Sequence, residues 1–202
     1  EVKQTKYYKI DTKNPEFTVE YFDENDNKIE GVNSDTIKYV NKKTYVKVTV
    51  DDYNFDNSDG EHVKLDVTKN DGKTVTEKLS FTQDKESEKT ADDGTVYHKW
   101  SARYELNNDT DYLIKVSKCM DAAGNDACAS DTYKTKKADK ITIDKTAPDI
   151  SVVYDSQAPA NNYNNHDYYK VEKTVTITVK DLSFSADKDK VKVMLKKDGV
   201  DT

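Results

Sequence analysis

Two cysteines are the residues whose type and spacing most directly suggest chemistry. Cys119 and Cys128 lie symmetrically about the pair Ala123-Gly124. In a hairpin that turns at this pair, the two thiols face each other across neighbouring strands, close enough for a disulfide. An exported protein would oxidise them, so we expect a disulfide that staples the hairpin, with two free thiols as the alternative. The spacing is not Cys-x-x-Cys, which argues against a redox active site.

The sequence lacks the patterns of catalytic and metal-binding sites. His62, His98 and His166 are scattered and do not have the spacing of zinc ligands. No Ser/His/Asp order with an elbow motif, no glycine-rich phosphate loop and no pair of catalytic carboxylates is recognisable. The acidic run 23–30 lacks the glycine and the glutamate of a calcium-binding EF-hand loop, so we interpret it as a solvated turn. We therefore expect a protein that is not an enzyme and has no cofactor.

Exposed tyrosines are the best candidates for contact with a ligand. The candidates are Tyr53, Tyr97, Tyr163, Tyr168 and Tyr169. Four of them lie in or near expected loops, and Tyr97 lies on the face of its strand opposite to that of Trp100. Tyrosine is favoured at interfaces because it offers a large amphipathic surface at low entropic cost. The alternative is that these residues pack between modules or simply favour strands.

Alternating apolar and polar residues predict β-strands along most of the chain. The segment 45–50 places Val46, Val48 and Val50 on one face. The same pattern predicts strands at 17–21, 63–67, 75–81, 96–106 and 112–116. The longest of these, 96–106, places the single tryptophan, Trp100, on its apolar face, and we expect Trp100 in the core. No segment sustains an apolar period of 3.6 residues, so the fold class is all-β.

Several local patterns predict the connections between these strands. Asn70-Asp71-Gly72 predicts a hairpin turn, since Asp-Gly supplies the positive φ of tight turns. Tyr112 follows the polar corner 107–111, which resembles the tyrosine corner of Greek-key sandwiches, where the hydroxyl bonds back to the backbone. After the cysteines, we expect a Lys/Thr-rich strand that includes residues 132–135.

Composition narrows the classes of partner. The chain has 202 residues, room for one large or two ordinary domains, and a formal net charge of −7 with a single arginine. This balance argues against nucleic acid, since phosphate binders need net positive faces. No apolar run approaches the roughly 20 residues needed to cross a bilayer, so no membrane insertion is expected. The opening Glu1-Val2-Lys3 is not a signal peptide and suggests a cut within a longer polypeptide.

An internal repeat predicts the domain organisation. Residues 10–21 align with 143–154 at an offset of 133, and the strand 46–50 aligns with 175–179 at an offset of 129. Further matches are Val63, Leu65 and Val67 with Val191, Val193 and Leu195, and Asp71-Gly72 with Asp198-Gly199. The register changes only in loops, where insertions are tolerated.

We therefore predict three parts: a last strand or linker of a preceding module at 1–10, a complete β-sandwich module at 11–144, and the first half of a second module at 145–202. Three strands of a sandwich expose an unpaired edge and a bare apolar face, so we expect the second module to be completed by further chain or by another partner. Asp11, Asp52, Asp144 and Asp181 recur near the junction, which leaves calcium between modules open. A Lys–Asn isopeptide crosslink also stays open.

The motifs at the junction carry a resemblance to a known class of repeats. Asp-x-Ala-Gly-Asn at 121–125 and Ile-Asp-x-Thr-Ala-Pro at 143–148 resemble the tandem bacterial immunoglobulin-like repeats of large Gram-positive cell-surface proteins. The resemblance covers nearly the whole chain and implies an immunoglobulin-like antiparallel β-sandwich in tandem, extracellular and non-enzymatic. The cysteine pair departs from the usual pattern of such repeats.

The resemblance also suggests what the chain does. We expect a module of a surface adhesin that contacts neighbouring modules and binds a host or environmental macromolecule, either a glycoprotein such as a secreted immunoglobulin or a glycan, through exposed strands or loops. One alternative is a structural spacer in a surface stalk. The other is an accessory domain of an extracellular carbohydrate-active enzyme. Fold alone does not choose among them.

Overall fold

The computed structural model describes residues 9–56, 58, 60–156, 158–184, 191–194, 196–197 and 200–201. It divides into two compact units, Glu1–Lys145 and Thr146–Thr202, and each is described by itself below. Most of the segment 1–10, the expected end of a preceding module, lies outside the described residues, and Lys9 and Ile10 are in no strand. No helix in the described part of the chain is long and apolar enough to span a membrane.

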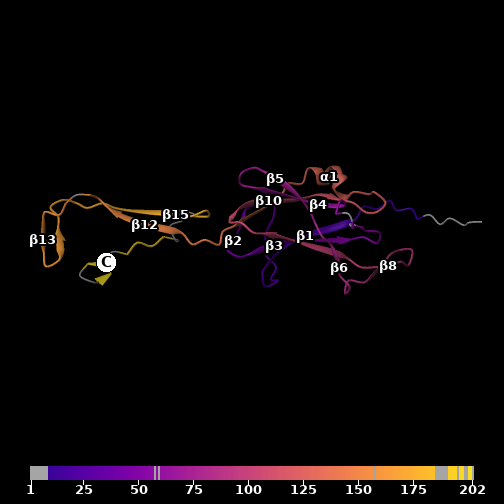
Figure 1. Ribbon diagram of the computed structural model, residues 1–202, viewed down its shortest axis with the longest axis horizontal. Helices are drawn as coiled ribbons and strands as arrows, with labels where there is room; N and C mark the ends of the chain where they lie inside the picture. Colours follow the sequence, from indigo (N-terminus) through magenta and orange to yellow (C-terminus); the bar gives the residue numbers. More distant parts are fainter. Residues whose placement is uncertain are drawn as a thin grey trace, which may run out of the picture. The chain divides into compact units, whose positions relative to one another are not determined.

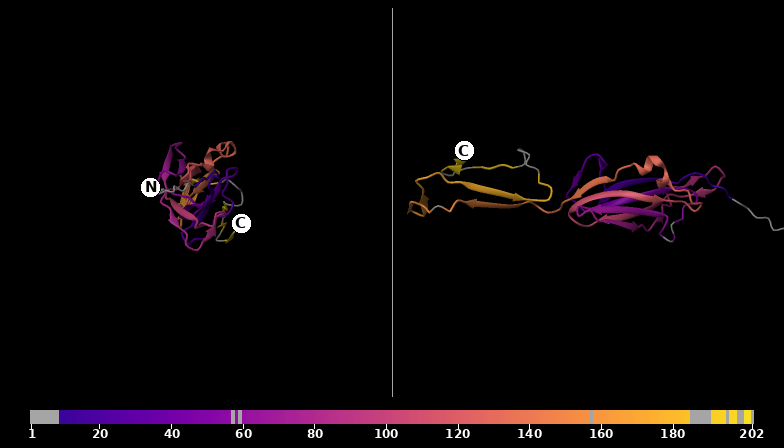
Figure 2. Two further views of the ribbon diagram at one scale, coloured as in Figure 1. Left: turned by 90° about the vertical axis from the view of Figure 1, so that its right-hand side faces the viewer. Right: turned by 90° about the horizontal axis from the view of Figure 1, so that it is seen from above.

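The first unit is a β-sandwich of two sheets (Figure 1). One sheet has the order β1 (Glu16–Asp23), β3 (Thr44–Asp51), β9 (Trp100–Leu106) and β6 (Thr82–Gln83). The other has the order β2 (Lys38–Val40), β11 (Asp139–Ile143), β10 (Thr110–Cys119), β4 (Val63–Lys69) and β5 (Thr74–Lys78). Neighbouring strands are antiparallel except β2 and β11, which are parallel. The two layers are seen from a second side in Figure 2. The expected all-β sandwich is confirmed.

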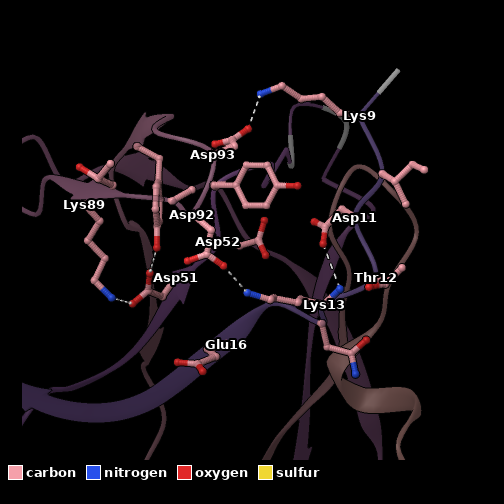
Figure 3. A pocket seen from close by; sticks show the side chains of 16 residues that line it. Lys9, Asp11, Thr12, Lys13, Glu16, Asp51, Asp52, Lys89, Asp92 and Asp93 are labelled. Carbon is pink, nitrogen blue, oxygen red and sulfur yellow. Dashed lines mark hydrogen bonds and ion pairs between the residues drawn. The ribbon is translucent and has the colours of Figure 1, made fainter. Parts of the chain in front are cut away.

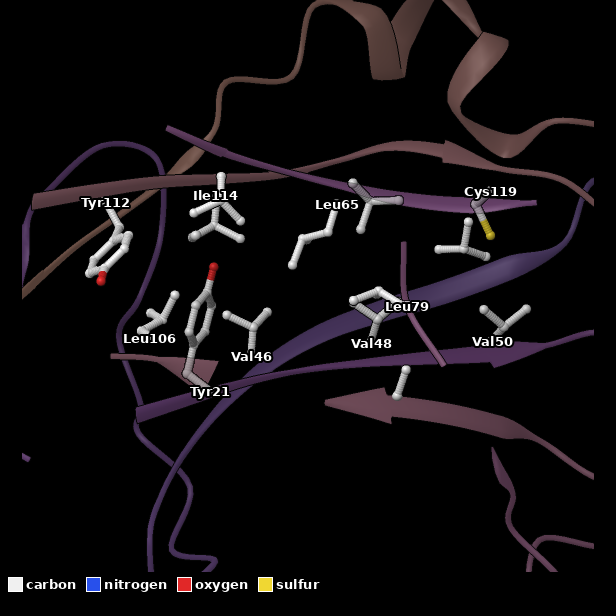
Figure 4. Close-up of a cluster of buried hydrophobic side chains, with 14 of the residues drawn as sticks. Tyr21, Val46, Val48, Val50, Leu65, Leu79, Leu106, Tyr112, Ile114 and Cys119 are labelled. Carbon is white, nitrogen blue, oxygen red and sulfur yellow. The ribbon is translucent and has the colours of Figure 1, made fainter. Parts of the chain in front are cut away.

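The core lies between the two sheets (Figure 4). Along β3 the side chains alternate, so Val46, Val48 and Val50 are buried while the residues between them are only partly covered. Leu65 of β4 and Ile114 of β10 belong to the same cluster from the opposite sheet. Trp100 is partly buried against this cluster, with its ring centroid 6.0 Å from that of Phe55. The expected place of Trp100 is therefore confirmed.

Two predicted connections are present. The hairpin between β4 and β5 turns at Gly72, which has a φ of +75°, and the Gly72 amide donates to the Lys69 carbonyl at 2.9 Å. The hydroxyl of Tyr112 donates to the Asn108 carbonyl at 3.2 Å and accepts from the Asn108 amide at 3.0 Å. This is the predicted tyrosine corner, and it fixes the start of β10 against the loop before it.

The expected long strand 96–106 is wrong, because it is two strands with a break. β8 (Val96–Tyr97) pairs with β7 (Lys89–Thr90) in a separate hairpin, and β9 begins at Trp100. At the break, the Lys99 amide donates to Ser87 Oγ and the Lys99 carbonyl accepts from the Asp84 amide. These bonds hold the backbone in a loop and remove it from the sheet, so Val96 is exposed. The longest strand is β10.

The expected strand at 132–135 is also wrong. Residues Ala127–Ala129 form a 3-10 turn, and Asp131–Lys134 form the one-turn helix α1. Ser130 caps this helix, because its Oγ accepts from the Tyr133 amide at 3.3 Å. The Tyr133 hydroxyl then donates to the Val116 carbonyl at 2.9 Å, which anchors the helix on β10.

In the segment 75–81, where a strand was expected, Val75 is exposed and Leu79 is buried, so the two side chains do not share a buried face.

The second unit consists of separate two-stranded pairs. They are β12 (Asp149–Tyr154) with β15 (Val175–Lys180), β13 (Asn161–Tyr163) with β14 (His166–Tyr168), and β16 (Lys196–Lys197) with β17 (Val200–Asp201). Three residues of the predicted repeat, Leu195 on its third strand and Asp198-Gly199 in the turn, lie outside the described residues.

The pairing of β12 with β15 agrees with the sequence alignment. Ile150 pairs with Val179 and Val152 pairs with Ile177. The residues aligned with them pair in the same way in the first unit, since Phe17 pairs with Val50 and Val19 with Val48. A second complete sandwich is not part of the described chain, so the tandem repeat stays a prediction.

Candidate functional site

A polar pocket of about 640 Å³ lies at the end of the first unit, beyond the last residue of β3 (Figure 3). Three stretches form it: residues 9–14 together with Glu16, residues 51–53 after β3, and the β7–β8 hairpin. Its lining residues are Lys9, Ile10, Asp11, Thr12, Lys13, Asn14, Glu16, Asp51, Asp52, Tyr53, Lys89, Thr90, Ala91, Asp92, Asp93 and Tyr97. The break before β9 is important for the pocket. Because β8 does not continue into β9, it pairs with β7 in a separate hairpin, and this hairpin forms one wall of the pocket.

Short aspartate-centred turns set the shape of the pocket. A carboxylate oxygen of Asp11 accepts from the Lys13 amide, that of Asp52 from the Asn54 amide, and that of Asp93 from the Thr95 amide, at 2.8–2.9 Å. Such turns let aspartate replace a backbone acceptor two residues before the donor. They therefore fix both the loops and the direction of the carboxylates.

Lysines of the pocket are paired with acids of the pocket. Lys9 lies 3.2 Å from Asp93, and Lys13 lies 2.9 Å from Asp92. Lys89 and Lys99 both contact Asp51, at 2.5 and 3.3 Å. Burial by itself raises the pKa of Asp51, but the hydrogen bonds from Lys89 and Lys99 outweigh it, and the pKa is lowered. The pairs of Lys9 and Lys13 are solvent-exposed and contribute little to stability.

Two of the five candidate tyrosines, Tyr53 and Tyr97, line this pocket, and both are half-buried where exposed side chains were expected. The Tyr97 hydroxyl donates to Asp51 at 3.3 Å, and the Lys9 ammonium lies 5.9 Å from the centre of the Tyr53 ring. The other three belong to the second unit: Tyr163 and Tyr168 lie on the β13–β14 hairpin, and Tyr169 follows it with the Lys173 ammonium 4.3 Å above its ring. All three are exposed.

Three carboxylates converge at one side of the pocket. Asp11, Asp52 and Asp121 each offer an oxygen, and these atoms lie within 4.8 Å of one another. Asp52 is 8% exposed and Asp121 is 1% exposed. Burial raises the pKa of Asp52 to about 6, opposed by the hydrogen bond from the Asn54 amide and reinforced by the charges of Asp121 and Asp11. Among the described residues, this is the only such group that could hold a metal ion.

Part of this group of carboxylates was predictable from the sequence. Asp11 and Asp52 are two of the four aspartates expected near the junction. Asp144 lies elsewhere in the first unit, with its amide bonded to the Val40 carbonyl, and Asp181 belongs to the second unit. Asp121 was missed as a ligand candidate, although it opens the Asp-x-Ala-Gly-Asn motif. The motif predicts a turn, but it does not show that the carboxylate of its first residue lies near other acids.

Cys119 and Cys128 are both buried, and the structure has them as free thiols. Cys119 ends β10, whereas Cys128 lies in the 3-10 turn, so the expected pair of facing strands is replaced by a strand and a turn. The Cys128 thiol lies 3.7 Å from the Val116 carbonyl. Burial raises the pKa of both thiols, that of Cys128 to about 12. The disulfide stays a prediction.

Comparison with known proteins adds no family assignment: no family model, no curated protein and no solved structure matches this chain.

Proposed function

We propose that this chain is a non-enzymatic immunoglobulin-like module of a bacterial surface adhesin, and that it binds a host glycoprotein or glycan through the pocket at the end of its first unit. The observation that carries the proposal is that Tyr53 and Tyr97 both line one polar, open cavity. Aromatic faces beside fixed hydrogen-bonding groups are suited to the alternating apolar and hydroxyl surfaces of sugars and of glycosylated polypeptides.

The loops that form the pocket suit such a role. They are held by aspartate-centred turns at the end of a rigid sandwich, which is where binding residues are commonly placed. The exposed carboxylates and ammonium groups of the pocket are already oriented by their mutual ion pairs. A ligand whose hydroxyls replace these ion-pair contacts would therefore bind side chains that lose little conformational entropy on binding.

The proposal is tested by measuring binding of the full chain to immobilised secretory immunoglobulin, to mucin and to an array of mucosal glycans. Saturable binding to one of these probes should be lost in Tyr53→Ala and Tyr97→Ala. It should be kept in Tyr39→Ala, which removes a tyrosine that is 59% exposed on β2, outside the pocket. Retention in all three variants, or loss in Tyr39→Ala as well, would reject the pocket as the binding surface.

A structural spacer is the second candidate, and one specific observation favours it. Lys9, Lys13 and Lys89 already form ion pairs with acids of the pocket, so these three lysines need no ligand to neutralise them. A spacer would show no saturable binding to any of the probes above, with wild type and pocket variants alike.

A further inference from the structure

We propose that Asp11, Asp52 and Asp121 form a calcium site beside the pocket. Three carboxylates with oxygens within 4.8 Å repel one another, and two of them are more than nine-tenths buried. Uncompensated buried charge is costly, so such groups are normally paired with a cation, protonated or bound to a metal.

The residues that the structure describes do not supply the compensating charge. The two lysines nearest in sequence, Lys9 and Lys13, form their ion pairs with Asp93 and Asp92. Within the described part of the chain, no lysine or arginine forms an ion pair with Asp11, Asp52 or Asp121. A ligand with positive charge is what this group lacks.

A second observation comes from hydrogen bonding. The Oδ2 atom of Asp11 is buried and has no hydrogen-bond partner among the residues that the structure describes. Asn54, whose amide donates to Asp52 and whose carbonyl accepts from the Ala122 amide, also has a buried side-chain oxygen without a partner in the same part of the chain. Buried oxygens of this kind are normally satisfied, and an unsatisfied one calls for a ligand.

The Asp-x-Ala-Gly-Asn motif explains how the third carboxylate is placed. Asp121 accepts from the Asn125 amide at 2.9 Å and from the Asn125 side-chain amide at 2.8 Å. The same side-chain amide donates to the Asp11 carbonyl at 3.2 Å. Gly124 closes the turn with a φ of +92°, a conformation that favours glycine. The motif thus ties the Asp121 turn to residue 11 and brings two ligands together from distant parts of the sequence.

The spacing and the ligand type indicate which ion fits. Hard carboxylate and amide oxygens suit calcium and magnesium and do not suit softer metals. Calcium binds oxygen at about 2.4 Å, so two of its ligands can lie as far apart as roughly 4.8 Å, whereas for magnesium the span is about 4.2 Å. The three oxygens lie within 4.8 Å of one another, so they can share one calcium ion. Magnesium usually keeps several waters and binds one or two carboxylates, so a group of three protein carboxylates favours calcium.

The test is a titration of the full chain with calcium and with terbium, a luminescent ion that replaces calcium. Tyr53 adjoins the group, since it directly follows Asp52 and lines the same pocket as Asp11 and Asp52. Excitation of tyrosine should therefore sensitise terbium emission, and calcium should quench it by competition. Calcium should also raise the unfolding temperature, by an amount that grows with the logarithm of its concentration above the dissociation constant, because it binds the folded state. Magnesium at equal ionic strength should do less.

The decisive variant is Asp52→Asn, which keeps the oxygen that accepts from Asn54 and removes one charge. Calcium affinity should fall by at least about tenfold, since affinity at such sites follows the number of charged ligands. Asp92→Asn is the matched control, because Asp92 lines the same pocket but is exposed and paired with Lys13. Circular dichroism checks that each variant is folded.

Absence of saturable binding of either ion to the wild type would overturn the proposal, as would equal losses in Asp52→Asn and Asp92→Asn. No macromolecular ligand is present in this titration, so its failure is separate from failure of the proposed adhesin function.

Discussion

At the scale of single residues, aspartate organises the loops of the first unit. Its carboxylate repeatedly accepts backbone amides two to four residues later, at Asp11, Asp23, Asp52 and Asp121. The same residue type has opposite electrostatic surroundings at different loops. Asp23 accepts several hydrogen bonds and contacts Lys42, whereas Asp52 is buried near other acids. These surroundings decide which carboxylate stabilises the fold and which lacks a compensating charge.

Asp23 should make stability depend on pH. Hydrogen bonds from the Asn27 amide and side chain, with help from Lys42, lower the pKa of Asp23 to about 2. A lowered carboxyl pKa contributes stability that is complete above the ordinary value and is lost as the pH falls toward the folded value. We expect Asp23→Asn to be less stable than wild type at neutral pH and to lose less stability between about pH 4 and pH 2.

This is measured by urea unfolding across that pH range, with Glu24→Gln as the control, since Glu24 is the exposed acid next to it. Parallel pH profiles for wild type and Asp23→Asn would contradict the assignment.

The tyrosine corner should be worth a measurable part of the stability. Tyr112→Phe removes a buried hydroxyl that makes two bonds to the backbone of Asn108. We expect a loss of about 1–2 kcal/mol in the free energy of unfolding. Tyr39→Phe removes an exposed hydroxyl and should change little. Equal effects of the two substitutions in denaturant unfolding would show that the corner is not a stabilising contact.

The two cysteines allow a direct chemical check. Burial and the raised pKa of both thiols predict slow reaction with a thiol reagent in the folded protein. If the expected disulfide forms during export, no thiol should react after denaturation without reductant, and the intact mass should be lower by two hydrogen atoms. Two reactive thiols after denaturation of protein that was folded under oxidising conditions would rule out the staple.

At the scale of elements, sequence patterns predicted the strands whose faces are buried on one side. The alternation in 45–50 and 63–67 is so regular because one face of each strand meets the core. The patterns failed where backbone bonding decided the structure. Lys99 bonds to the 84–87 loop, and Ser130 caps a helix at a place where the sequence predicted a strand. The period of a side-chain pattern does not record either interaction.

The candidate site was only partly predictable for a related reason. Tyr53, Tyr97, Asp11 and Asp52 were recognisable as residue types that bind ligands. Their convergence depends on the hairpin β7–β8 and on the break before β9, which the pattern at 96–106 concealed. Asp121 reaches the group through the turn to Asn125 and the contact of Asn125 with residue 11. Long-range contacts of this kind are set by tertiary structure.

Side-chain truncations at aligned positions of the two units should have different effects on the free energy of unfolding. Leu65 is fully buried, whereas Val193, its counterpart in the alignment, is 60% exposed. Leu65→Ala should therefore cost about 2–5 kcal/mol, and Val193→Ala should cost less than about 0.5 kcal/mol. Trp100 is the only tryptophan and packs in the first unit, so its fluorescence reports unfolding of that unit. A similar shift of this transition by both variants would contradict the division into independent units.

At the scale of the whole molecule, the two units differ in how much apolar surface they bury. The first encloses one continuous core between two sheets. In the second, Ile150, Val152 and Tyr154 on β12 are exposed, although their counterparts on β1 pack toward the core. Binding is therefore proposed for the first unit, where loops are fixed on a complete sandwich, while the tyrosines of the β13–β14 hairpin are the competing location.

Hydrogen exchange, read by mass spectrometry on the full chain with and without secretory immunoglobulin as the probe, tests this location most directly. The proposed function predicts slower exchange of amides in residues 9–16, 51–54 and 89–97 when the probe is bound, with no change in residues 161–169. Protection confined to 161–169 would place binding on the second unit, and protection in neither region at saturating probe would contradict binding to this class of glycoprotein.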